Sequence, residues 1–267
     1  MFSCSPTKYL LEDEYLLDSN KILFEEDSIR GKSHSRQIAV DELYPILKQM
    51  PNRKIGFGLA RVHLRIYNLS NEDRIQKRKL INKNKADKKN LKIDEKNIKR
   101  RAKDKLPKQY KVVKTTFGEG LRGSGEAPVV LDSIKIHRSI KQINNQLINE
   151  GYFNNKISYK VFFGKHQKAE VTYIISEGEP YTIKQIKNQI NDSVLSSYIK
   201  SISQDSYLKV GENFNTDKMD YERTRLTKYL LDNGYHFFNK EFIYFRIDSA
   251  LGSRQVNVVL GIQNYKV

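Results

Sequence analysis

One pattern occurs twice in this chain: Leu147-Ile-Asn-Glu-Gly-Tyr-Phe153 and, 83 residues later, Leu230-Leu-Asp-Asn-Gly-Tyr-His236. The apolar residues that lead into each copy recur at helical spacing, at Ile140, Ile143 and Leu147 and again at Met219, Leu226 and Leu230. A glycine directly after such a helix is typical of the left-handed position that closes a helix C-terminus. The repeat therefore predicts two helices that end in the same way.

Strand-like runs follow each predicted helix, at 157–163 and 169–175 in the first copy and at 242–247 and 256–262 in the second. Another such run, 181–190, precedes the second copy, and the spacing over 194–202 predicts a short helix. The second copy thus has the order β-α-α-β-β over 180–264, in which two helices cover one face of a three-stranded sheet. We predict an α+β fold with tandem units of this kind.

Further motifs surround the repeat. They are Val210-Gly-Glu-Asn-Phe214, Leu231-x-x-Gly234-Tyr235, Gly125-Glu-Ala-Pro-Val-Val-Leu-Asp132, Glu177-Gly-Glu-Pro-Tyr181, Pro51-Asn-Arg-Lys54 and Leu64-x-Ile-Tyr-Asn-Leu69. Together with the β-α-α-β-β order, they resemble POTRA domains, and they are similar to the periplasmic part of Bacteroidetes-type BamA/TamA outer-membrane assembly proteins. The resemblance is strongest over 125–264 and covers nearly the whole chain.

The resemblance implies two POTRA-like units, the first of which is interrupted. Its first half is 20–50 and its second half is 127–178, with a basic insertion and linker over 51–126 between them. The second unit is 179–264, and residues 1–19 form an N-terminal lead or lipoprotein tether.

The resemblance also implies a function. The chain is expected to be a periplasmic binding scaffold at the outer membrane, to which an extended client strand adds at an exposed sheet edge. The expected edge is the second strand of each unit, with client or partner contacts from Ile157, Tyr159, Val161, Phe242, Tyr244 and Ile247. For Tyr159 and Tyr244, an ordinary core or rim role is an equal alternative. The expected partners are unfolded outer-membrane proteins and other periplasmic assembly subunits.

Two features concern the ends of the chain. Phe2-Ser3-Cys4 is similar to the end of a lipobox, so the resemblance makes Cys4 a lipid anchor; an incidental N-terminal cysteine is the alternative. Members of the family normally continue into a membrane β-barrel, whereas this chain ends at Val267. We expect either a fragment or a barrel on a separate chain.

Charge is concentrated in one segment. The chain has a formal net charge of +17, and residues 74–114 hold eighteen Lys and Arg against four acids. We predict a mostly helical arm over 72–105, capped by the hydroxyl of Ser70. Three roles are open: a solvated insertion, attraction to an anionic membrane or acidic protein, and nucleic-acid binding, which the scarcity of aromatic residues disfavours. The basic surface is represented by Lys77, Arg78, Lys79, Lys99, Arg100 and Arg101.

Two short segments receive their own predictions. The alternation over 61–67 predicts a half-buried strand or an interfacial segment. The glycine-rich run 117–126 predicts a flexible linker. Its Gly118-x-Gly120-x-x-Gly123 matches the dinucleotide fingerprint, but Pro128 follows closely and position 143 is Ile, where the cofactor site needs an acid.

No motif for catalysis was found. The five histidines are dispersed, no Gly-x-Ser-x-Gly is present, and a single cysteine excludes an intrachain disulfide. We therefore expect no enzyme activity, no cofactor and no metal.

Overall fold

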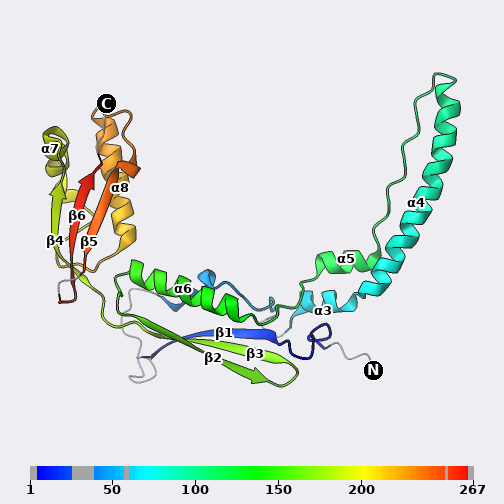
Figure 1. The fold of residues 1–267 in the computed structure, drawn as a ribbon, viewed down its shortest axis with the longest axis horizontal. Coiled ribbons are helices and arrows are strands. Elements are labelled where there is room, and N and C mark those ends of the chain that lie inside the picture. Colours follow the sequence, from blue (N-terminus) through cyan, green and yellow to red (C-terminus); the bar gives the residue numbers. More distant parts are fainter. Residues whose placement is uncertain (1–4, 26–38, 57–59, 250–251, 264–267) are drawn as a thin grey trace. The chain divides into compact units, whose positions relative to one another are not determined.

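A computed structural model of the protein describes residues 5–25, 39–56, 60–249 and 252–263 (Figure 1). The chain divides into two compact units, whose segments alternate along the sequence. Unit 1 comprises residues 1–20, 49–132 and 161–171, and unit 2 comprises residues 21–48, 133–160 and 172–267.

The elements follow each other in chain order. The strands are β1 (Leu16–Phe24), β2 (Lys156–Gly164), β3 (Lys168–Ser176), β4 (Thr182–Gln189), β5 (Ile243–Asp248) and β6 (Gln255–Ile262). The α-helices are α2 (Val40–Leu43), α3 (Val62–Leu69), α4 (Glu72–Arg101), α5 (Phe117–Ser124), α6 (Ser133–Asn149), α7 (Ser193–Ser201) and α8 (Thr216–Asp232). The 3-10 turns are η1 (Tyr44–Ile46), η2 (Ser203–Asp205) and η3 (Lys240–Phe242).

The second repeat lies within unit 2 and has the predicted order β4-α7-α8-β5-β6. Its sheet has the strand order β4-β6-β5, with β4 parallel and β5 antiparallel to the central β6. Helices α7 and α8 pack on this sheet through Leu195, Ile199, Leu226 and Leu230, which share one buried cluster with Leu260 of β6. Burial of these side chains drives the helices onto the sheet.

The first repeat has the same strand pattern. Its sheet has the order β1-β3-β2, so the last strand of the repeat is again central. Alternate residues of β3 are buried, at Ala169, Val171, Tyr173 and Ile175. Helices α3, α4 and α5 come between α2 and α6 in the chain, as the predicted basic insertion requires. The α+β fold with tandem POTRA-like units is therefore confirmed.

The repeated Leu-x-x-x-Gly-Tyr sequence is a helix-ending motif. Gly151 and Gly234 have φ angles of 91° and 95°, and the residue after each glycine bonds back into the helix. The Tyr152 amide donates to the Leu147 carbonyl (2.9 Å), and the Tyr235 amide donates to the Leu230 carbonyl (3.0 Å). These six-to-one bonds define a Schellman motif, which requires the left-handed glycine.

The strand predicted over 61–67 was wrong, because residues 62–67 belong to helix α3. Its buried residues are Leu64 and Asn68, one helical turn apart. The Asn68 amide group donates to the carbonyls of Ser5 (3.1 Å) and Pro6 (3.2 Å), which holds that turn against the N-terminal segment. Seven alternating residues are too few to separate a strand from a short helix when such contacts decide.

The prediction of a flexible linker at 117–126 was also wrong. Helix α5 occupies most of it and begins with a capping box, in which the Glu119 amide donates to the Thr116 hydroxyl (3.2 Å) and the Thr116 amide donates to the Glu119 carboxylate (2.7 Å). Gly118 and Gly125 permit close packing: a Cβ at Gly125 would lie 2.6 Å from the Tyr67 amide nitrogen. These two glycines therefore serve helix packing here, whereas a Cβ at Gly120 or Gly123 would meet nothing within 4 Å.

The predicted helical arm is confirmed over α4, which ends at Arg101. Its cap is Asn71, whose side chain accepts from the Arg74 amide (2.9 Å), whereas the Ser70 hydroxyl donates to the Tyr67 carbonyl (2.6 Å). The predicted hydroxyl cap at Ser70 was therefore wrong. Among the described residues, no helix joins the length and the apolar character that crossing a bilayer requires.

Candidate strand-addition edges and the basic arm

Strand β5 lies at one edge of the second-repeat sheet, and its register shows which backbone groups face outward. The Gln263 amide donates to the Phe242 carbonyl (2.8 Å), so these two residues form a hydrogen-bonded pair. Hydrogen-bonded and non-hydrogen-bonded pairs alternate in antiparallel sheets. Tyr244 and Arg246 therefore bond to β6, and the backbone groups of 243, 245 and 247 face away from it. The Ile243 amide donates to the Lys240 carbonyl, so the amides open to a partner are those of 245 and 247.

The other edge of this sheet is covered at its start. The Ile183 amide donates to the Glu212 carbonyl (2.8 Å), and the Gly211 amide donates to the Ile183 carbonyl (2.8 Å). The Phe214 amide likewise donates to the Tyr181 carbonyl (2.8 Å). The turn 210–214 thus closes the outer side of β4 at this end, which leaves β5 as the more accessible edge of the second repeat.

The predicted contact residues near β5 have internal neighbours. Phe242 lies in the turn before β5, with its ring 5.6 Å from that of Phe238. Ile247 packs on the buried cluster that includes Val258. Tyr244 pairs with Gly261, and its ring occupies the space that a side chain there would need. At this edge it is therefore the backbone that is available for a partner.

Strand β2 is an edge strand of the first-repeat sheet. The predicted residues Ile157, Tyr159 and Val161 are half-buried, and the Tyr159 ring makes an edge-on contact with His137 of α6 at 5.5 Å. The alternate side chains of the strand are exposed. Phe162 is 71% exposed, although it is not among the contact residues that were named individually. The Phe162-Phe163 pair was the available signal, since neighbouring residues of a strand point to opposite faces.

The basic arm consists of α4 and the segment 106–116 that returns along it in Figure 1. Three asparagines of α4 hold this return segment by its backbone. Asn97 and Asn90 each bond both the amide and the carbonyl of one residue, Lys108 (2.6 and 3.0 Å) and Lys111 (2.7 and 3.1 Å), respectively. Asn82 donates to the Lys114 carbonyl (2.9 Å). The asparagines are seven or eight residues apart, which is about 11 Å along a helix, and their partners are three residues apart, which is a similar length of extended chain. The two spacings therefore match along the arm.

The six predicted basic-surface residues lie at two separate places. Lys77, Arg78 and Lys79 are near the start of α4, and 99–101 end it, about 33 Å further along the axis. The Lys79 ammonium pairs with the Glu119 carboxylate at 3.0 Å. The arm therefore carries a long stripe of charge, not one compact basic patch. Its Tyr110 hydroxyl donates to the Asp94 carboxylate, which raises the tyrosine pKa and occupies the hydroxyl.

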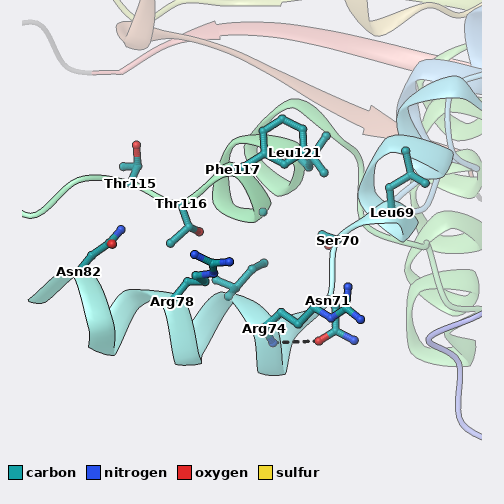
Figure 2. A pocket seen from close by; sticks show the side chains of 12 residues that line it. Leu69, Ser70, Asn71, Arg74, Arg78, Asn82, Thr115, Thr116, Phe117 and Leu121 are labelled. Atoms are coloured by element: carbon teal, nitrogen blue, oxygen red, sulfur yellow. Dashed lines mark hydrogen bonds between the residues drawn. The ribbon is translucent and has the colours of Figure 1, made fainter.

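A pocket of about 640 Å³ opens at the base of the arm, between the start of α4 and α5 (Figure 2). Arg74, Arg78 and Thr116 supply polar groups, and Ile75 and Leu121 supply an apolar wall. Arg78 belongs to the predicted basic surface, but the pocket itself depends on α5, for which the sequence predicts a linker.

The remaining predictions concern the lipid anchor and metal binding. Cys4 lies outside the described residues, so the lipid anchor stays a prediction. Over the described residues, no group of three or more His, Cys, Asp or Glu side chains could hold a metal ion.

No family model matches the chain, and no curated protein matches it in sequence. The chain is similar to the solved POTRA3-5 region of BamA from Haemophilus influenzae, with 14% identity and a TM-score of 0.33 over 96% of this chain and 100% of that one. A structure of BamA from Haemophilus ducreyi lacking POTRA domains 1-3 gives 15% identity and a TM-score of 0.33, over 53% of this chain.

The N-terminal domain of Omp85 from the cyanobacterium Thermosynechococcus elongatus gives 16% identity and a TM-score of 0.28 over 53% of this chain. The matched part spans 25% of the H. ducreyi chain and 57% of the Omp85 chain. The strand orders β1-β3-β2 and β4-β6-β5 themselves carry the fold assignment. Both repeats are POTRA-like.

Proposed function

We propose that this chain is a periplasmic binding scaffold of an outer-membrane protein assembly or translocation machine. In this role it receives extended client chains by strand addition, next to a β-barrel on the same or a separate chain and in company with other periplasmic subunits. The observation that carries the proposal is the outer edge of β5, where three residues direct their backbone groups away from β6. The resemblance of the sequence motifs to POTRA domains supports the cellular setting.

Strand addition suits a scaffold with many clients. A client strand that pairs with β5 would bond to the amides and carbonyls of Phe245 and Ile247 and to the carbonyl of Ile243. Every client has the same main-chain groups, so binding tolerates different sequences, and side-chain contacts adjust the affinity. This work needs no catalytic group, in agreement with the expected absence of enzyme activity.

Photo-cross-linking tests the proposal. A benzoylphenylalanine replaces Arg246, which is exposed on β5, and in a matched control it replaces Tyr221, which is exposed on α8. The probe is a synthetic peptide of about ten alternating apolar and polar residues, the pattern of a membrane β-strand. We expect capture at 246 and little at 221. Equal capture at both positions would contradict strand addition at β5.

The salt dependence of binding distinguishes strand addition at β5 from the alternative, nucleic-acid binding by the arm. The charge of the arm favours that alternative, whereas the engagement of Tyr110 with Asp94 disfavours base stacking on the arm. Binding of RNA or DNA through 74–114 should weaken steeply between about 50 and 200 mM salt. Capture of the peptide at β5 should change little over this range.

A further inference from the structure

The pocket at the base of the arm contains two arginines that have no acidic partner. Arg74 and Arg78 are one turn apart on α4, and neither side chain forms an ion pair among the described residues. The nearby acids are engaged elsewhere: Glu72 pairs with Arg122, and Glu119 pairs with Lys79. The pocket therefore keeps two uncompensated guanidinium groups.

The opposite wall of the pocket is apolar and partly open to water. Ile75 is buried beneath it, and Leu121 of α5 lies beside it. At the rim, Phe117 is 83% exposed and Leu69 is 61% exposed. Figure 2 shows Arg78 near Thr116, with Phe117 and Leu121 together on the α5 side. A ligand that fits both walls has an anionic head attached to an apolar chain.

The polar side of the pocket suits a phosphate group. A guanidinium offers a planar pair of donors that matches two phosphate oxygens, and the Thr115 and Thr116 hydroxyls can add further bonds. A carboxylate has only two oxygens to share between two arginines and two hydroxyls. An acyl chain against Leu69 and Phe117 would cover apolar surface that water now contacts.

Beyond the pocket, basic side chains continue along one side of α4. Ten basic residues of α4 fall within a sector of about 140° around the helix axis: Arg74, Lys77, Arg78, Lys85, Lys88, Lys89, Lys92, Lys96, Lys99 and Arg100. Glu95 is the one acid of α4 in this sector. The return segment is held on another side of α4 by Asn90 and Asn97 and at one edge of this sector by Asn82, so it leaves most of the basic stripe uncovered.

We propose that this pocket binds the phosphate headgroup of an anionic phospholipid and that the basic stripe holds the arm on the surface of the same membrane. A nucleic acid would bind the basic stripe, but it has no apolar chain to pack against the apolar wall of the pocket. The proposal does not depend on strand addition at β5, since the pocket lies wholly within unit 1 and β5 within unit 2.

Vesicle binding of the full chain tests it, with phosphatidylcholine vesicles that contain or lack phosphatidylglycerol. The pocket variant is Arg74→Gln with Arg78→Gln. The matched control is Lys85→Gln with Lys89→Gln, which removes the same charge at the same spacing on exposed positions outside the pocket. Each charge near an anionic membrane is worth roughly fivefold in binding. We expect the arginine pair to lose at least about fivefold more than the lysine pair, because it also loses bidentate bonds.

A second pair of variants keeps the charge constant. Leu121→Gln should weaken binding to the anionic vesicles, and Leu91→Gln, on exposed α4 surface outside the pocket, should weaken it less. Equal losses in the arginine and lysine pairs would overturn the pocket. Full competition by soluble glycerol phosphate would show that the phosphate alone suffices, which would overturn the role of the apolar wall. Absence of binding to anionic vesicles, or an arginine-dependent preference for duplex RNA, would overturn the lipid assignment.

Discussion

At the residue scale, Gly151 and Gly234 make the same helix end in two surroundings. Both have a φ angle above 90°, which a residue with a side chain adopts only at a cost. A Cβ at Gly151 would also lie 2.8 Å from the Phe214 carbonyl oxygen, whereas a Cβ at Gly234 would have no atom within 4 Å. The sequence repeat predicts the shared conformation, but only the structure reveals this difference in packing.

We therefore expect Gly151→Ala to destabilise the protein more than Gly234→Ala. Each substitution should cost about 1–2 kcal/mol for the left-handed backbone, and Gly151→Ala should cost about 1 kcal/mol more for the clash with backbone. Urea unfolding of the two variants measures the difference. Equal costs would show that the Phe214 carbonyl yields freely.

Asp18 in unit 1 makes a pH-dependent contribution. Its carboxylate accepts from Arg61 (2.8 Å), and Lys168 lies 3.4 Å away. Partial burial acts to raise the Asp18 pKa, but the Arg61 bond and the nearby cations outweigh it, so the pKa is lowered. A lowered pKa gives stability that is present above the unfolded value, about 3.9, and is lost as the pH falls through the folded value.

Asp18→Asn should thus cost about 1 kcal/mol at pH 7, a modest figure because solvent screens a partly exposed pair. As the pH falls from 5 to below the unfolded pKa of aspartate, about 3.9, the variant should lose less stability than the parent chain. Urea unfolding at several pH values measures this, with the exposed Asp13→Asn as control. A variant that follows the parent curve in acid would refute the assignment.

At the element scale, α6 and α8 could be predicted and α3 and α5 could not. The long helices have several turns of apolar spacing and a glycine stop, so their sequences are sufficient. Helix α5 has three glycines in eight residues, which argues against a helix by propensity. Its capping box and its packing against Ile75 and Tyr67 decide otherwise. Tertiary contacts of this kind are not visible in the local sequence.

The glycines of α5 give a matched test of this explanation. A Cβ at Gly118 would lie 2.5 Å from Cγ1 of Ile75, whereas a Cβ at Gly120 would meet nothing within 4 Å. Gly118→Ala should destabilise the docked helix by about 1–3 kcal/mol through overpacking. Gly120→Ala should stabilise it by about 0.5–1 kcal/mol, because alanine favours the helix. Thermal or urea unfolding of each variant measures the effect; two destabilised variants would show that α5 needs flexible glycines.

At the scale of the whole molecule, the internal repeat predicts the architecture, and the edge geometry needs the structure. The order β-α-α-β-β follows from the two copies of one pattern, and the first repeat contains the basic insertion as expected. The outward amides of β5 depend on a register that one residue of slip would reverse. Tyr244 was predicted as an edge contact from the sequence, but its backbone groups bond inward to β6.

Amide hydrogen exchange along β5 tests the central claim most directly. In the free chain, the Phe245 and Ile247 amides should exchange fast, and the Tyr244 and Arg246 amides should be protected by β6. Addition of the alternating peptide should slow the exchange of the first pair and leave that of the second pair unchanged. The account is contradicted if the peptide binds and the amides of 245 and 247 keep their free-chain exchange rates.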